Sequence, residues 1–173
     1  MDEIIQKPEN WHKCMMEMAF CISKMSKDPS TKVGCVIVSP DKRRITVGYN
    51  GFPSLIQDKR VWWEQRDKNL EDYCKYDLSN HAEMNAIIQA KTDLSGWSVY
   101  VTHQPCLDCA RVIVTTGIKN VYYSMGNDKA SMDLKLPKVK KLFKMANVKL
   151  SQMKLKDGAY SNKEIPILDE CEL

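Results

Sequence analysis

The sequence lacks the long apolar run that a membrane-spanning helix requires. Of its 173 residues 43% are hydrophobic, yet no apolar stretch approaches the ~20 residues of a membrane span. Residues 1–10 are polar and carry acidic residues at their start, so we expect no export signal there. We therefore expect a cytoplasmic protein with no membrane partner.

A regular cysteine framework is also missing, because the seven cysteines are odd in number and unevenly spaced. Without an export signal, this argues for metal ligands or free thiols over disulfides. Internal repeats and low-complexity segments are absent too. The length suits one domain. We expect this domain over residues 1–156, with a polar insertion at 54–79 and a loosely held tail at 157–173.

The net charge is a mild +4, and many basic residues come late in the chain. These are Lys135, Lys138, Lys140, Lys141, Lys144 and Lys149. Apolar residues recur among them at helical spacing, which places the lysines on the solvated face of a helix. No aromatic residues interleave with the lysines, so a stacking platform for bases is missing. We expect no nucleic-acid partner.

The hydrophobic pattern alternates between helix and strand. It predicts helices from about Trp11 to Ile22, around Val61 to Asp67, from Ala82 onward, over Leu107 to Thr116 and over the lysine-rich segment. It predicts strands over Val33 to Val38, Ile45 to Tyr49, Val99 to Thr102, Val121 to Ser124 and Val148 to Leu150. The first two strands read as a hairpin. The expected fold is a three-layer α-β-α sandwich of the α/β class, with a mixed sheet of about five strands.

Two short motifs carry the chemistry, and each begins a predicted helix. One contains His81 and Glu83, and the other contains Pro105, Cys106 and Cys109. The two cysteines are three residues apart, so they share one helix face. A helix N-terminus favours anionic sulfur, which prepares thiolate ligands. The motifs therefore predict a zinc site made of His81, Cys106 and Cys109.

Three protein ligands leave one zinc position for water, as catalytic sites require. Zinc lowers the pKa of bound water to ~7, and Glu83 lies near enough to take up and deliver protons. Two alternatives remain. One is a structural zinc site closed by His103 or another cysteine, and the other is a redox pair of cysteines. A carboxylate two residues after the histidine favours the catalytic interpretation.

Three segments resemble signatures of the deoxycytidylate (dCMP) deaminase family, within the cytidine deaminase superfamily. They are Ser-Lys-Asp-Pro-Ser-Thr-Lys-Val-Gly at 26–34, Gly-Tyr-Asn-Gly-Phe-Pro at 48–53 and His-Ala-Glu-Met-Asn-Ala-Ile at 81–87. The H-x-E and P-C-x-x-C pairing is the signature of zinc nucleobase deaminases. The resemblance covers roughly residues 10 to 150.

The resemblance implies hydrolysis of dCMP to dUMP and ammonia, which supplies thymidylate synthesis. It also implies that Asn50 contacts the sugar and that the backbone at Ala82 contacts the pyrimidine O2. Ser26 and Lys27 lie in the segment that approaches the phosphate, although an ordinary polar loop explains them equally well. Tyr123 could flank the base or pack in the core.

Family members are commonly hexamers that dCTP with Mg²⁺ activates and dTTP inhibits. Here Met25 replaces a frequent arginine and Leu55 a frequent glycine, so we expect altered phosphate binding and altered regulation. Cys74 is the one cysteine in the insertion, which predicts a single zinc per chain. Trp62 and Trp63 fit either an interface between copies or a small local cluster.

Other functions compete with this one. Another zinc deaminase could act on tRNA adenosine, on single-stranded DNA cytosine or on a riboflavin precursor. A zinc-stabilised binding module without turnover is the alternative from a different class. Within the dCMP deaminase interpretation, dCTP could also serve as a substrate.

Overall fold

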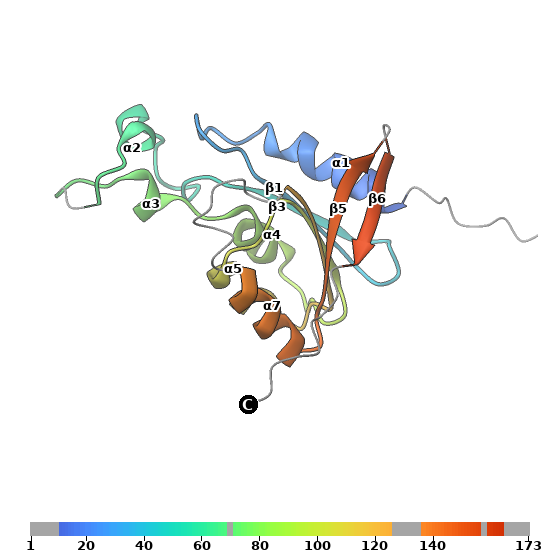
Figure 1. The fold of residues 1–173 in the computed structure, drawn as a ribbon. Coiled ribbons are helices and arrows are strands. Elements are labelled where there is room, and N and C mark those ends of the chain that lie inside the picture. The colour runs from blue at the N-terminus through green and yellow to red at the C-terminus, as the bar shows by residue number, and fades with distance from the viewer. Residues whose placement is uncertain (1–10, 69–70, 126–135, 157–158, 165–173) are drawn as a thin grey trace, which may run out of the picture.

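The computed structural model describes residues 11–68, 71–125, 136–156 and 159–164 (Figure 1). The helices are α1 (Trp11–Ser23), α2 (Arg60–Glu64), α3 (Lys75–Leu78), α4 (Ala82–Ala90), α5 (Leu107–Thr115) and α7 (Leu136–Met145). The strands are β1 (Gly34–Val38), β2 (Ile45–Tyr49), β3 (Ser98–His103), β4 (Asn120–Met125), β5 (Lys149–Lys156) and β6 (Ala159–Glu164). Within the described residues, no helix is long and apolar enough to cross a membrane.

One mixed sheet of six strands organises the chain, in the order β2-β1-β3-β4-β5-β6. Strand β1 pairs antiparallel with both β2 and β3. The next pairs, β3 with β4 and β4 with β5, are parallel. Helix α5 begins shortly after the end of β3, and a bridge between Gly51 and Asn80 ties the start of α4 to the end of β2. Both predicted motifs therefore lie at one edge of the sheet.

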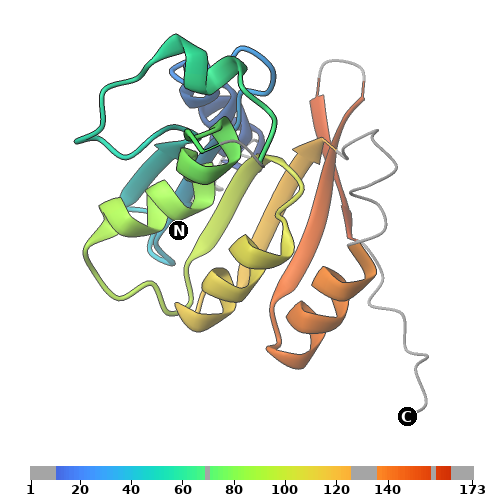
Figure 2. The same ribbon diagram turned by 90° about the vertical axis from the view of Figure 1, so that its left-hand side faces the viewer.

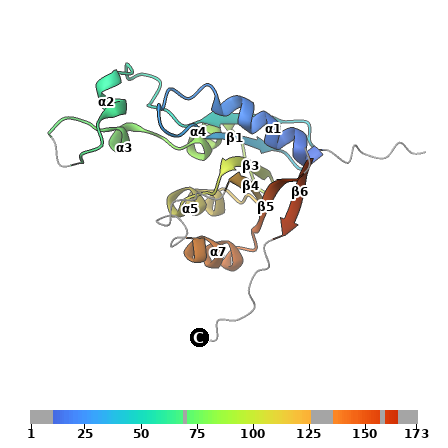
Figure 3. The same cartoon turned by 45° about the horizontal axis from the view of Figure 1, so that its top comes forward.

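Helices cover both faces of the sheet, as the alternating pattern predicts. Helix α1 lies on one face, and α4, α5 and α7 lie on the other (Figures 2 and 3). Strand β1 explains why both faces need a cover, because its successive side chains are apolar and point to opposite faces. Cys35 and Ile37 pack in the core under α4, α5 and α7, whereas Val36 and Val38 pack against α1. The three-layer α/β fold is confirmed.

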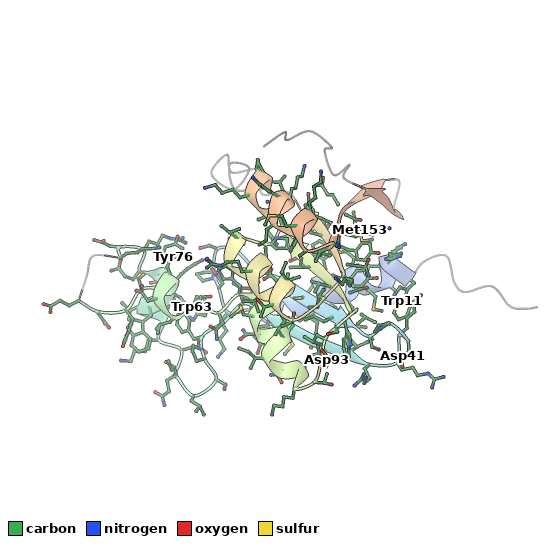
Figure 4. The ribbon with its side chains drawn as sticks, turned by 90° about the horizontal axis from the view of Figure 1, so that it is seen from below. Trp11, Asp41, Trp63, Tyr76, Asp93 and Met153 are labelled. Atoms are coloured by element: carbon green, nitrogen blue, oxygen red, sulfur yellow. The ribbon has the colours of Figure 1, made fainter. Side chains whose placement is uncertain are left out.

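The segment at 54–79 projects from one end of the molecule and carries α2 and α3 (Figure 1). Trp63 and Tyr76 lie in it, at the opposite end from Trp11 and Met153 (Figure 4). The ring of Trp63 stacks on Phe52 with centroids 3.9 Å apart, and its Nε1 donates to Asp58. Trp63 therefore belongs to a local cluster, one of the two roles expected for it.

The structure differs from the sequence expectations at three places. The helix in the insertion ends at Glu64, and a second helix, α3, follows. The sheet has six strands instead of about five, because β6 forms within the tail that we expected to be loosely held. Its sequence shows no apolar alternation, and pairing with β5 satisfies backbone groups that an edge strand would leave exposed.

Candidate metal centre and active site

The two motifs meet because each occupies the start of a helix on the same face of the sheet. His81 is the N-cap residue of α4, and Cys106 is the N-cap residue of α5. The side chains of His81, Cys106 and Cys109 offer ligand atoms that all lie within 4.8 Å of one another. The Nδ1 atom of His81 is 3.4 Å from the Cys106 sulfur and 3.3 Å from the Cys109 sulfur.

The charges of this cluster suit a divalent cation. Hydrogen bonds from Cys109 and His81 lower the pKa of Cys106 to about 3, although burial opposes this. The hydrogen bond with Cys106 raises the pKa of His81 to about 9. The pKa of Cys109 is raised, because its proton is held in the hydrogen bond with Cys106 and because it is buried. A metal ion would replace these shared protons, as metal binding to thiol and imidazole ligands generally does.

Two thiolates and one imidazole fit zinc, and a set of three leaves a position open for catalysis. No fourth histidine, cysteine or carboxylate joins the group among the residues that the structure describes. His103 lies on the same cavity, but its Nδ1 is hydrogen-bonded to Thr102 Oγ1 at 3.0 Å. The described residues therefore do not close the site as a structural zinc site would be closed.

Glu83 is the second residue of α4 and lies beside the cluster with 4% of its surface exposed. Burial raises the pKa of its carboxyl group, while its hydrogen bond with Cys109 acts in the opposite direction. A raised pKa makes a buried carboxyl group a better proton acceptor than an ordinary carboxylate, and its protonated form can return the proton.

Two residues of the cluster, His81 and Cys106, line a cavity of about 540 Å³, a volume within the range of small-molecule sites. The floor is formed by His81, Ala82, Glu83 and Cys106. The rest of the lining comes from the loop after α1, the end of β2, the insertion and the end of β3: Asp28, Ser30, Thr31, Val33, Asn50, Arg66, Lys75, Tyr76, Ser79, His103 and Gln104.

Comparison with known proteins agrees with this geometry. The model of the cytidine and deoxycytidylate deaminase zinc-binding region matches residues 9–125. The chain belongs to this family. It is 37% identical to the deoxycytidylate deaminase of Pongo abelii, over 80% of this chain and 76% of that protein. It is 38% identical to a probable deoxycytidylate deaminase of Caenorhabditis elegans, over 86% of this chain and 73% of that protein.

A solved structure shares the fold of this deaminase. The dCMP deaminase of cyanophage S-TIM5, in complex with dCMP and dUMP, aligns with a TM-score of 0.64 at 26% sequence identity. The alignment covers 86% of this chain and all of that one, 100%. The deaminase domain therefore matches its solved relative over the full length of the relative.

Asn50 lines the cavity of the deaminase and is held in place by the protein. Its Oδ1 accepts from the backbone N–H of Val33 at 2.8 Å. Its Nδ2 donates to the Thr31 carbonyl at 2.9 Å and to Asp28 Oδ2 at 3.3 Å. Both amide protons are thus used, whereas Oδ1 has a second lone pair.

The residues expected at the phosphate and the base lie elsewhere. Ser26 is buried and donates to the Asn50 carbonyl at 2.8 Å, and it does not line the cavity. Lys27 pairs with Asp58 and faces a different hollow, beside β2 and α4. Tyr123 is buried in the core with 2% exposed, which agrees with the packing role.

Sequence reasoning missed the two cations from the insertion that do line the cavity, Arg66 and Lys75. No spacing rule could have found them, because the insertion is rich in charged residues of both signs and has no periodic pattern. Their neighbours in the cavity, Ser30 and Thr31, lie in the segment at 26–34 that the sequence had marked. The segment was informative, but the residues in it that line the cavity are Asp28, Ser30, Thr31 and Val33, and not Ser26 or Lys27.

Proposed function

We propose that this deaminase hydrolyses dCMP to dUMP and ammonia. Water supplies the oxygen that replaces the exocyclic amine, and the amine leaves with the protons that complete ammonia. The observation that carries the proposal is the buried Glu83 carboxyl group, which lines the same cavity as His81 and Cys106 of the ligand cluster. A purely structural metal site has no use for such a carboxyl group.

His81, Cys106 and Cys109 would hold one zinc ion, and Glu83 would move the protons. Bound zinc supplies Lewis-acid activation of water at neutral pH. Glu83 accepts a proton from the attacking water and then delivers protons to the ring nitrogen and to the departing amine. The raised pKa of the buried carboxyl group matches this double task.

Other residues of the cavity orient the substrate. Ala82 is the first residue of α4, so its backbone N–H has no acceptor within the helix and can donate to the pyrimidine O2. The unused lone pair of Asn50 Oδ1 can accept from a sugar hydroxyl. Because hydrogen bonds to Thr31, Val33 and Asp28 fix the amide, this acceptor is preorganised.

Ammonia release is the decisive test. Zinc-loaded protein is incubated with dCMP, dCTP, CMP and deoxycytidine, and ammonia is measured. We expect dCMP to be the preferred substrate, with dCTP as the possible second one. Absence of ammonia with dCMP would overturn the proposed function. Elemental analysis in parallel should give one zinc per chain in the wild type and loss of zinc in Cys109→Ala.

We further propose a cytoplasmic homo-oligomer, a hexamer as is common in the family, that supplies thymidylate synthesis. Exposed apolar side chains around the hollow beside β2 and α4 support an assembly, namely Met25, Ile45, Tyr49, Ile56 and Ile88. dCTP with Mg²⁺ and dTTP are the candidate effectors. Leu55 is 98% exposed and does not have a positive φ, so the loop differs from one built on glycine.

A further inference from the structure

Two cationic side chains from the insertion, Arg66 and Lys75, line the active-site cavity, and their charges are used differently. Lys75 is buried, and its ammonium donates to Asp28 Oδ2 at 2.5 Å. Asp28 is equally buried, so this pair is neutral within the protein. Lys75 is therefore committed to Asp28 and offers no net charge to a ligand.

Arg66 is exposed, and its partners are uncharged. One nitrogen donates to the hydroxyl of Ser30, and Nη1 donates to the hydroxyl of Tyr76 at 3.2 Å. No carboxylate pairs with this guanidinium among the residues that the structure describes. The ammonium of Lys68 lies 4.9 Å from the Tyr76 ring centroid, which adds positive charge near the same point.

The cavity thus has two chemically different ends. At its floor Ala82 and Glu83 are buried, and Cys106, one of the metal ligands beside them, is half-buried. Ser30, Arg66 and Tyr76 are exposed, so they form its open end. A cytosine ring belongs at the buried floor, where the proton-transfer chemistry is, and a doubly charged phosphate belongs at the end that stays in contact with water.

We infer that Arg66, together with the hydroxyls of Ser30 and Tyr76, binds the 5′-phosphate of the nucleotide substrate. Guanidinium matches phosphate oxygens in a two-pronged geometry that ammonium cannot reproduce. On binding, both hydroxyls turn from accepting an Arg66 proton to donating their own to phosphate oxygens. The inference rests on the proposed function, because it assumes a mononucleotide in this cavity.

This assignment replaces the one expected from the segment at 26–34. Lys27 is ion-paired with Asp58 and faces the hollow beside β2 and α4 instead of the active site. Met25, which stands where the family often has arginine, lines that same hollow. Arg66, a cation from the insertion, therefore supplies the positive charge that the segment at 26–34 does not bring to the cavity.

Equilibrium binding tests the phosphate site without relying on turnover. Zinc-loaded wild type is titrated with dUMP and with deoxyuridine by calorimetry. We expect dUMP to bind at least about tenfold more tightly, and Arg66→Ala to weaken dUMP binding about 10- to 100-fold, as loss of hydrogen bonds to a charged group does. Deoxyuridine binding should not change. Arg66→Lys should be intermediate, and Ser30→Ala and Tyr76→Phe should each cause a smaller loss for dUMP alone.

Arg60→Ala is the matched control, because Arg60 lies on α2, is exposed and pairs with Glu64 outside the cavity. It should bind both ligands as the wild type does. The inference is overturned if wild type binds dUMP no more tightly than deoxyuridine. It is also overturned if Arg66→Ala leaves dUMP binding intact or weakens both ligands equally.

Steady-state kinetics separates this inference from the proposed function. With dCMP, Arg66→Ala should raise KM far more than it lowers kcat, and kcat/KM for deoxycytidine should be unchanged. Wild type that binds dUMP through Arg66 but releases no ammonia from dCMP would retain the phosphate site and refute the reaction. Normal dCMP kinetics in Arg66→Ala would retain the proposed reaction and refute the phosphate site.

Discussion

Asp28 connects three parts of the cavity through one buried carboxylate. It accepts from the backbone N–H groups of Ser30 at 2.8 Å and Thr31 at 3.2 Å. It also accepts from the side chains of Asn50 and Lys75. A single residue thereby orients the loop after α1, the amide of Asn50 and the insertion. Its role is positioning, since its oxygens are occupied by protein donors.

The pH dependence of stability should reveal this role. Burial raises the pKa of Asp28, but hydrogen bonds from Lys75 and from the backbone of Ser30 and Thr31 bring it below its ordinary value. A depressed folded-state pKa means that the stabilisation is complete above about pH 4 and is lost as pH falls through the lower folded-state value.

We therefore expect Asp28→Asn to reduce the free energy of unfolding by about 3–5 kcal/mol at pH 7, because Lys75 is left buried without a counter-charge. Urea denaturation should show this difference shrinking below about pH 4. The double variant Asp28→Asn/Lys75→Met removes both charges and should recover part of the loss. A difference that stays constant down to pH 2 would contradict the assigned ionisation of Asp28.

Glu83 is the residue on which turnover should depend. Glu83→Gln preserves shape and hydrogen bonding but cannot exchange protons, so kcat for dCMP should fall at least 10²–10⁴-fold, the usual contribution of general acid–base catalysis. Elemental analysis should still find zinc, because Glu83 is not in the ligand group.

Asp108→Asn provides the comparison for Glu83→Gln. Asp108 is another carboxylate near the cluster, but it is exposed and paired with Arg111. Its substitution should leave kcat nearly unchanged. Normal turnover in zinc-loaded Glu83→Gln protein would remove Glu83 from the proposed reaction.

At the scale of elements, the site depends on how closely α4 packs against β2. A Cβ atom at Gly48 would lie 2.4 Å from both the Ala82 carbonyl oxygen and the Ala86 backbone nitrogen. These are backbone atoms of the helix that follows His81 and carries Glu83. Glycine at 48 therefore allows the contact that sets the height of the metal motif above the sheet.

Gly48→Ala should displace α4. We expect a loss of about 1–3 kcal/mol or more in the free energy of unfolding, as overpacking costs, together with weaker zinc retention against a chelator. Gly51→Ala is a suitable control, because its Cβ would meet only the Tyr49 ring, at 3.7 Å or more. Equal zinc retention and stability in the two variants would show that the close packing is unimportant.

At the scale of the whole molecule, one surface carries much of the exposed apolar area that the structure describes. Ile88 on α4 and Met25 after α1 border the same hollow beside β2 and α4. An assembly of copies would cover such a surface, since contiguous apolar patches on soluble proteins commonly mark interaction sites.

Light scattering of the zinc-loaded protein should therefore give the mass of a homo-oligomer, with a hexamer expected. Ile88→Glu should lower that mass by placing a charge in the interface. Met145→Glu, on the far helix α7, introduces the same charge at another exposed apolar side chain and should have no effect. A monomer at micromolar concentration would end the proposal of assembly.

The proposed regulation by dCTP and dTTP belongs to the same scale as the proposed assembly. With leucine at 55, we expect the dCMP saturation curve to respond weakly to dCTP–Mg²⁺ and to dTTP, because effector coupling is typically only ~1–3 kcal/mol and an altered turn can remove much of it. Initial rates are measured across dCMP concentrations with each effector. A strongly sigmoidal curve that dCTP makes hyperbolic and dTTP suppresses would show that Leu55 does not weaken the switch.

The sequence alone determined the fold class and the metal motif. His81 and Glu83 are two residues apart, and Cys106 and Cys109 are three apart, so their relative positions follow from local helix geometry. The layers also followed locally, because the continuous apolar run of β1 is buried on both faces of the sheet, with successive side chains packing alternately into the two cores. Such information is short-range and is therefore visible in a pattern of residues.

Only the tertiary structure decided which residues complete the cavity. The pairing of Lys75 with Asp28 joins positions 47 residues apart, and that of Arg66 with Ser30 joins positions 36 apart. Neither contact follows from periodicity, since both depend on how the insertion packs against the loop after α1. The pairing of β6 with β5 is of the same kind, because backbone hydrogen bonding, which every sequence offers, forms it without an apolar pattern.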